Sequence, residues 1–461
     1  MSGQRCICKG IVILLYGVYF LLAPAVALWS EEGQKDEQSR LTDWRETLLY
    51  GLDTEVMGVL EDIKTTNETG LNRELAQIFS TSIKTDIRVA VLDFFREQKD
   101  RLIETQALAA LKEYEDQESD LVTALIRYLS VIGSGEIMDL LKKLLQHEDA
   151  GIASGAIRAL REEALRPAVG EDFVKLLLDK LEDDGFEEKL KPEIILTLGA
   201  LKNRVAVEYL ISVLEDRENA SLMRMYAADS LGEIGDDRAI PVLKSVFIEK
   251  DALLRAYAAS ALSNFDINEV IDLLMEGLRD SNWRVRVASA KGLAHGGAKE
   301  ALATLLYRAR KDPARDVRLE TFKALGSIAE QEGLDLLREI YLSEGESLEI
   351  RTAALEVLIK SDPTAAIAAI GKIVERDLNK PLLEARILEY TAKLLSRVQE
   401  PALKEIFKKF LRSPNLAVKI QGIRGIAANR FSDLRAALAE MSEKDPHPGV
   451  RKEARTAIEK W

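Results

Sequence analysis

A repeated pattern of apolar positions runs along most of this chain, and the stretch DSNWRVRVASAKGL, residues 280–293, shows it clearly. The stretch is centred on Arg286, with an aliphatic residue just before it, a small residue three later and a leucine seven later. These offsets fall on one face of an α-helix, because a helix makes a turn every 3.6 residues. The pattern therefore predicts an amphipathic helix, which we call a register helix, and we call Arg286 its anchor.

The same pattern recurs in twelve copies at intervals of 31 to 38 residues. The basic anchors are Arg88, Lys191, Arg224, Arg255, Arg286, Arg318, Arg351, Lys419 and Arg451, and three weaker copies have Val122, Ala153 and Glu384. The residue before the anchor is apolar in every copy. A period near 33 residues indicates stacked supersecondary units.

Each register helix is followed by a second amphipathic segment, such as residues 239–250 or 300–311, and then by polar or proline-bearing residues. In three places a polar residue is followed directly by a proline, which predicts a helix N-cap followed by a proline in the first turn. They are Asp312-Pro313, Ser413-Pro414 and Asp445-Pro446. Three glycines one residue after the register leucine, Gly199, Gly232 and Gly326, are expected to take a left-handed conformation where the first helix ends. Each unit is thus predicted to be helix, turn, helix.

The pattern aliphatic-Arg-x-x-Ala-Ala-x-x-Leu-Gly is complete at residues 223–232 and nearly complete at 254–262. It resembles the HEAT repeat, in the short bacterial form also called the phycobilisome-lyase HEAT-like repeat, over roughly residues 80–461. The resemblance implies an all-α, right-handed α-solenoid of about twelve helix-turn-helix repeats. The family includes adaptors, assembly factors and a minority of enzymes, so the resemblance implies no single function.

The N-terminal residues have the layout of a secretory signal. An apolar run ends at Ala27, Arg5 and Lys9 precede it, and Ala25-Val26-Ala27 fits the small-x-small cleavage rule. We therefore expect a signal peptide at 1–27 and an exported protein that resides in a bacterial periplasm or outside the cell. The alternative is an uncleaved N-terminal membrane anchor, since residues 11–28 approach the length that spans a bilayer.

The rest of the chain divides by pattern. Residues 28–40 are polar and are expected to form a linker, and residues 41–82, where Arg45 echoes an anchor, a divergent helical N-terminal cap. Residues 83–461 are expected to form the solenoid. The last helix either serves as a cap, with Trp461 covering the core, or offers that face to a partner.

Cysteine content and charge exclude several classes of function. Cys6 and Cys8 both lie in the predicted signal, so the mature chain has no disulfide, thiolate metal site or cysteine nucleophile. The formal net charge is −13, and removing Arg5 and Lys9 leaves 62 basic and 77 acidic residues, or −15. An acidic protein lacks the charge that supplies non-specific nucleic-acid affinity, so we expect no nucleic-acid partner.

Candidate chemistry is sparse. The three histidines are far apart in sequence, and no phosphate-binding loop, nucleophile elbow or zinc-protease motif is present. We expect no catalytic residue, no cofactor and no metal. The acidic stretch 181–191 is interpreted as a solvated turn rather than a calcium site, because it lacks the alternating ligand spacing of an EF-hand.

The anchors allow two interpretations. They are either a basic surface for an acidic ligand or structural groups that bond an acid or carbonyl of the adjoining repeat, and Asp280, Asp316 and Glu349 are placed to accept. HEAT-like families use this position structurally, so the resemblance favours the second interpretation. The structural anchor series is Arg224, Arg255, Arg286, Arg318 and Arg351.

Residues 393–435 reverse the sign of the chain, with ten basic and three acidic residues. Within them, the candidate partner-binding residues Lys404, Lys408, Lys409 and Arg412 are expected to share the polar face of a second helix and to project toward the concave side. This face is either solvated or an attachment surface for an acidic protein or for anionic phospholipid headgroups.

These observations favour a non-enzymatic exported scaffold or adaptor that binds another, unidentified protein along the solenoid surface. The alternative, suggested by the resemblance to bilin lyases, is a lyase-type HEAT-repeat enzyme acting on a protein substrate.

Overall fold

A computed structural model describes residues 37–183, 185–380 and 384–461, and the predicted signal peptide lies outside them. The described residues form helices joined by short loops and contain no strand, so the all-α prediction is confirmed. None of their helices is long and apolar enough to cross a membrane. The chain divides into an N-terminal unit, up to Val205, and a C-terminal unit, from Ala206.

The N-terminal unit begins with a helix over residues 37–50, so the end of the predicted linker, residues 37–40, is helical. The helices that follow are α2 (Asp53–Thr66), α3 (Asn72–Thr81), α4 (Thr85–Gln98), α5 (Glu104–Lys112), α6 (Ser119–Val131), α7 (Met138–Leu144), α8 (Ala150–Ala159), α9 (Glu171–Glu182) and α10 (Lys191–Leu201). Within this unit the even-numbered helices pack side by side, α2 on α4, α4 on α6 and α6 on α8.

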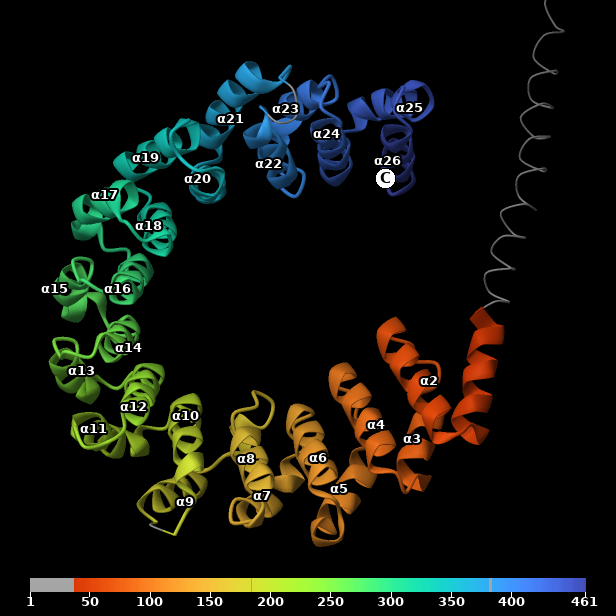
Figure 1. The fold of residues 1–461 in the computed structure, drawn as a ribbon, viewed down its shortest axis with the longest axis vertical. Helices are drawn as coiled ribbons and strands as arrows, with labels where there is room; N and C mark the ends of the chain where they lie inside the picture. Colours follow the sequence, from red (N-terminus) through yellow and green to blue (C-terminus); the bar gives the residue numbers. More distant parts are fainter. Residues whose placement is uncertain (1–36, 184, 381–383) are drawn as a thin grey trace, which may run out of the picture. The chain divides into compact units, whose positions relative to one another are not determined.

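The C-terminal unit continues the alternation. Its helices are α11 (Val207–Glu215), α12 (Ser221–Ile234), α13 (Ile240–Val246), α14 (Ala252–Leu262), α15 (Ile267–Gly277), α16 (Trp283–His295), α17 (Leu302–Lys311), α18 (Arg315–Ile328), α19 (Gln331–Leu342), α20 (Leu348–Ser361), α21 (Pro363–Asp377), α22 (Arg386–Leu395), α23 (Lys404–Phe410), α24 (Leu416–Asn429), α25 (Arg435–Lys444) and α26 (Pro448–Glu459). The even-numbered helices form the inner layer of this unit and the odd-numbered helices the outer layer (Figure 1).

The register helices are the even-numbered helices α4 to α26, and eleven of the twelve predicted anchors lie in them. The twelfth anchor, Glu384, lies just before α22. The core lies between the two layers, where the apolar positions around the anchor meet the second helices. Around Arg286, for example, Val285, Ser289 and Leu293 are all fully buried.

The three glycines expected to cap helices lie inside them instead, so that prediction is wrong. Left-handed residues end these helices three positions later, at Lys202, Gly235 and Ala329. A Cβ on Gly232 would lie 2.6 Å from the Cα of Ala261 in α14. This glycine therefore allows two register helices to approach closely, and the helix continues past it for one more turn.

The predicted N-cap and proline pairs are also displaced. Asp312 follows the end of α17, and its carboxylate accepts a hydrogen bond from the backbone N–H of Ala314, the residue that precedes α18. Ser413 and Asp445 make the same turn two residues before Asn415 and His447, which are the actual N-caps of α24 and α26. The prolines thus stiffen the loop between repeats.

Candidate functional site

Four successive anchors of the C-terminal unit, Arg224 to Arg318, form two-pronged (bidentate) ion pairs, each joining a register helix to the loop that precedes the next register helix. Arg255 donates to both carboxylate oxygens of Asp280 at 2.8 and 3.0 Å, and Arg286 to both of Asp312 at 2.8 Å. The other two pairs of this kind are Arg224 with Glu249 and Arg318 with Glu346. Planar guanidinium groups suit such two-pronged contacts with carboxylates.

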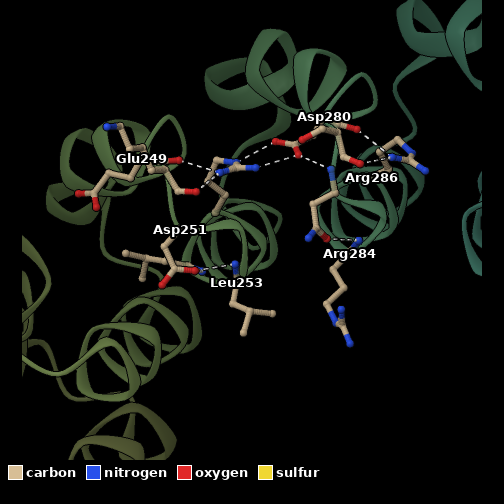
Figure 2. Close-up of polar contacts among 11 residues, drawn as sticks. Glu249, Asp251, Leu253, Asp280, Arg284 and Arg286 are labelled. Atoms are coloured by element: carbon tan, nitrogen blue, oxygen red, sulfur yellow. Dashed lines mark hydrogen bonds and ion pairs between the residues drawn. The ribbon is translucent and has the colours of Figure 1, made fainter.

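Each of these anchors also donates to a backbone carbonyl that precedes its own helix: Arg224 and Arg318 to carbonyls in the last turns of α11 and α17, and Arg255 and Arg286 to carbonyls of the loop. Arg255 reaches the carbonyl of Glu249 at 2.8 Å, and Arg286 reaches that of Asp280 at 2.8 Å. Figure 2 shows Asp280 between the two guanidinium groups, its carboxylate facing one and its carbonyl the other. One loop residue is therefore held by two successive anchors.

The same double contact occurs near the C-terminus. The carboxylate of Asp445 accepts from Lys419 at 3.1 Å, while its carbonyl accepts from Arg451 at 2.7 Å. A lysine thus replaces the arginine here with a single bond to the carboxylate. The repeat-to-repeat connection is kept although the cation differs.

Burial separates the central pair from the others. The side chains of Arg286 and Asp312 are 7% and 0% exposed. Glu249 and Glu346 are more accessible, and the hydrogen bonds from Arg224 and Arg318 lower the pKa of their carboxyls. Burial alone would raise the pKa of Asp280, but Arg255 and the N–H of Asn282 outweigh it, and that pKa is lowered.

The pattern changes at Arg351, the last member of the predicted anchor series. Its Nε donates to the carbonyl of Tyr341 at 2.9 Å, but the buried carboxylate of Asp377 is held by Arg376 and Lys380. Within the described part of the chain, Nη2 of Arg351 is buried without a hydrogen-bond partner. Burial, followed by the charge of Arg376, lowers the pKa of Arg351.

Two of the three acids expected to pair with anchors do not. Asp280 pairs with Arg255 as described, whereas Asp316 and Glu349 both pair with Arg315, an exposed arginine that is not an anchor. Those two acids project from the ends of register helices rather than from the loops, so they cannot reach the anchors.

The anchors of the N-terminal unit have different partners. Arg88 donates to the side-chain carbonyl of Gln117 at 3.1 Å and lies over the ring of Phe79. Lys191 pairs with Glu188 of its own loop at 2.6 Å. The two-pronged acid pairs just described belong to the C-terminal unit.

Sequence reasoning missed the partners Glu249, Asp312 and Glu346. The signal was present, because each basic anchor that pairs across repeats has an acid 25 to 28 residues later. That acid occupies the loop before the next anchor, so it could have been found by comparing loops in register.

The four candidate partner-binding residues lie at α23, which belongs to the outer layer, so the expected concave location is wrong (Figure 1). Lys404 pairs with Asp433 at 2.6 Å, Lys408 with Glu405 at 3.8 Å and Lys409 with Glu375 at 3.9 Å. Arg412 follows the helix and forms no ion pair with a described residue. Neighbouring acids therefore offset much of the positive charge that the sequence shows here.

Two further features are the acidic stretch 181–191 and the C-terminal Trp461. Asp184 of the acidic stretch lies outside the described residues, and in the described part no group of three His, Cys, Asp or Glu side chains is arranged to hold a metal. At the other end, Trp461 is half-buried, and the guanidinium of Arg435 lies 6.0 Å from its ring centroid.

The chain is similar to known proteins in three ways: over short stretches of sequence, in its fold, and over most of its length to one family. Over 80 residues the chain is 35% identical to the deoxyhypusine hydroxylase of Candida albicans, which is 17% of this chain and 24% of that protein. The enzyme of the same name from Debaryomyces hansenii matches over 74 residues with the same identity, 16% of this chain and 23% of that one. The chain spans about a quarter of the length of these curated relatives.

The fold is shared with importin beta. A crystal structure of importin beta aligns with 95% of this chain and 69% of its own length at 15% identity, with a TM-score of 0.50. The CpcE–CpcF complex of phycocyanin lyase from Nostoc sp. PCC7120 covers 50% of this chain and 92% of its own at 21% identity, with a TM-score of 0.33. The Spirochaete HEAT repeat protein model matches residues 48–457, nearly the whole described chain. This confirms the HEAT resemblance, and the chain belongs to the spirochaete HEAT repeat protein family.

Proposed function

We propose that this protein is a non-enzymatic scaffold that binds another protein through the exposed face of its register helices. The observation that carries the proposal is a patch on α12 and α14, defined by Leu222, Tyr226, Leu253 and Tyr257. Leu222 and Leu253 are 48% and 43% exposed and occupy the same position, two residues before their anchors. Tyr226 and Tyr257 are half-buried two residues after those anchors.

The patch has the composition of a protein interface. α12 and α14 pack directly against each other, and burial together with the nearby Asp229 and Tyr226 raises the pKa of Tyr257. Leu253 points away from the ion pairs of the anchors (Figure 2). Adjacent exposed apolar residues often mark interaction sites, and tyrosine is enriched among residues that dominate binding energy.

The anchors also support this proposal, because their hydrogen-bond donors are already used within the protein and are not free to bind a ligand. The four anchors Arg224, Arg255, Arg286 and Arg318 donate to carboxylates of the loops and to backbone carbonyls, so a ligand would compete with the contacts that connect the repeats. The local similarity to two hydroxylases covers about a sixth of this chain, too little to bring an activity to it. A lyase-type enzyme acting on a protein is the alternative.

A photo-crosslinking residue at Leu253 in the native host tests the patch. We expect it to capture a defined partner band that Tyr257→Asp abolishes. A matched control places the same group at Ile248, which is 72% exposed between α13 and α14. Equal capture at both positions would contradict the assignment of this face.

We also propose that the protein is exported, as the layout of residues 1–27 supports. N-terminal sequencing of native protein should give Leu28 as the first residue. A chain that still carries residues 1–27 would instead be held by an N-terminal anchor.

A second proposed contact is the outer-layer set Lys404, Lys408, Lys409 and Arg412. Replacing the three lysines with glutamate should preserve folding, because exposed ion pairs contribute roughly 0–1 kcal/mol each. If the set binds an acidic protein, capture should weaken in a salt-dependent way. If it contacts lipid, binding to anionic phosphatidylserine vesicles should fall, and no change in either assay makes it a solvated face.

A further inference from the structure

The N-terminal unit carries a groove of about 770 Å³ that runs across α2 and the register helices α4 and α6. Leu60, Val89, Ala90 and Ala124 contribute apolar and small side chains to its lining. Leu60 and Ala124 are buried, while Val89 and Ala90 are half-buried. Val89 and Ala90 thus give the groove a small accessible apolar floor.

Its rim is acidic, and most of that charge is not neutralised by the chain itself. Glu61, Asp86, Glu118 and Asp120 line the groove, are exposed and form no ion pair with any residue the structure describes. Of the other charged lining residues, Asp93 pairs with Arg96 and Lys64 with Glu97, which leaves Arg127 as the one lining cation without such a pair. This differs from the paired acids of the C-terminal unit.

Local helix stability accounts for part of the rim only. Asp86 and Asp120 lie in the first turns of α4 and α6 and Glu118 precedes α6, where a negative charge interacts favourably with the helix dipole. Glu61 lies in the second half of α2, where the dipole gives it no such advantage. A role in binding explains why all four face one groove.

We infer that this groove docks a cationic amphipathic segment of a partner protein, with its apolar side chains on the floor and its lysines or arginines at the rim. The inference rests on the proposed scaffold function and names the chemistry of the partner. Two helix spacings of roughly 8–10 Å separate α2 from α6, or about 18 Å, which about twelve residues of a helix would span. An elongated segment suits such a groove better than a compact ligand.

The first experiment measures binding of a fluorescein-labelled fourteen-residue Leu/Lys amphipathic peptide to the full-length protein by anisotropy. Glu61→Gln, Glu118→Gln and Asp120→Asn together should weaken binding about tenfold or more and flatten its salt dependence. The matched control removes three acids from the exposed face of α15, with Glu269→Gln, Asp272→Asn and Glu276→Gln. This control should stay within about twofold of wild type.

A second pair of variants tests the floor without changing charge. Ala90→Trp fills the groove and should abolish peptide binding, whereas Ala353→Trp, at the same position two residues after an anchor in α20, should not. Circular dichroism checks that each variant is folded. Equal effects of both triple variants, or no effect of Ala90→Trp, would overturn the inference.

Spermine separates a segment from a small cation. We expect weak spermine binding that Ala90→Trp leaves unchanged; tight spermine binding that competes with the peptide would make the groove a polyamine site and overturn the inference. Crosslinking from Leu253 is read independently. If peptide binding fails but crosslinks from Leu253 still form, only the inference about the groove is wrong. If no crosslinks form, the proposed patch on α12 and α14 is wrong.

Discussion

At the scale of single residues, Arg286 and Asp312 are the most buried of the two-pronged pairs. Their interaction offsets the cost of removing both charges from water, so the pair as a whole adds little stability. Breaking it is different, because one partner remains charged and buried. Asp312 would retain only Arg308, at 3.3 Å, and the N–H of Ala314.

We therefore expect Arg286→Ala to lower the free energy of unfolding by about 3 kcal/mol. Arg315→Ala is the control, since Arg315 is 59% exposed and its ion pairs lie on the surface. It should cost less than about 1 kcal/mol. Urea unfolding followed by circular dichroism measures both, and equal losses would make the anchor no more structural than a surface arginine.

Acid should weaken the connection between repeats at Glu249. Arg224 lowers the pKa of this carboxyl below its ordinary value of 4.5 in the folded chain. Because the pKa of this carboxyl is lower in the folded than in the unfolded chain, its ionisation stabilises the folded protein at pH values above the unfolded pKa. This stabilisation is lost as the pH falls through the folded pKa. Stability should thus decline below about pH 4.5. Glu249→Gln should be less stable than wild type at pH 7, and the difference should shrink by pH 3; a constant difference would contradict this.

The sequence predicted the anchors and their buried neighbours because both repeat at fixed offsets on one helix face. It did not predict Glu249, Asp312 and Glu346 as partners, because they lie in loops whose lengths vary by several residues. It placed Lys404, Lys408 and Lys409 on an exposed face, but the acid partners of Lys404 and Lys409 come from other elements. Cross-element pairing of this kind requires the packed structure.

At the scale of helices, glycines set how closely neighbours pack. Gly232 faces the backbone of Ala261 in α14, whereas an added Cβ on Gly371 in α21 would meet nothing within 4 Å. Sequence alone treats both as helix-weakening residues. Their surroundings give them opposite roles: Gly232 allows close packing inside a helix, whereas Gly371 faces open space.

Substitution by alanine should separate these roles. Gly232→Ala should destabilise the protein by about 1–3 kcal/mol, because α12 and α14 must move apart to make room. Gly371→Ala should instead stabilise it by about 0.5–1 kcal/mol, since the helix loses a flexible residue without a clash. Chemical unfolding measures both, and the same sign for both would contradict the close-packing role.

At the scale of the whole molecule, contacts connect helices that are near neighbours in the chain. Register helices pack on the preceding and following register helix and on the second helix of the preceding repeat, as α16 does with α14, α18 and α15. Stability in such an arrangement is approximately a sum over repeats and the interfaces between neighbours. A local change should therefore remain local.

Hydrogen exchange in Arg286→Ala tests this directly. Amide protection should fall in α16 and at the start of α18, because the lost ion pair connects α16 to the loop before α18, and remain at the wild-type level in α4 and α6. Loss of protection at the same rate throughout both units would show that the chain unfolds as a single cooperative body.

The double contact at Asp280 also bears on how such a chain grows. Its carboxylate accepts hydrogen bonds from the anchor of one repeat, and its carbonyl accepts one from the anchor of the next. Glu249 and Asp445 make the same two contacts. A duplicated segment would bring one arginine and one loop acid together, so its insertion would leave no charge stranded at either junction. Duplication or deletion of whole repeats can then lengthen or shorten this part of the solenoid while its junctions keep their ion pairs.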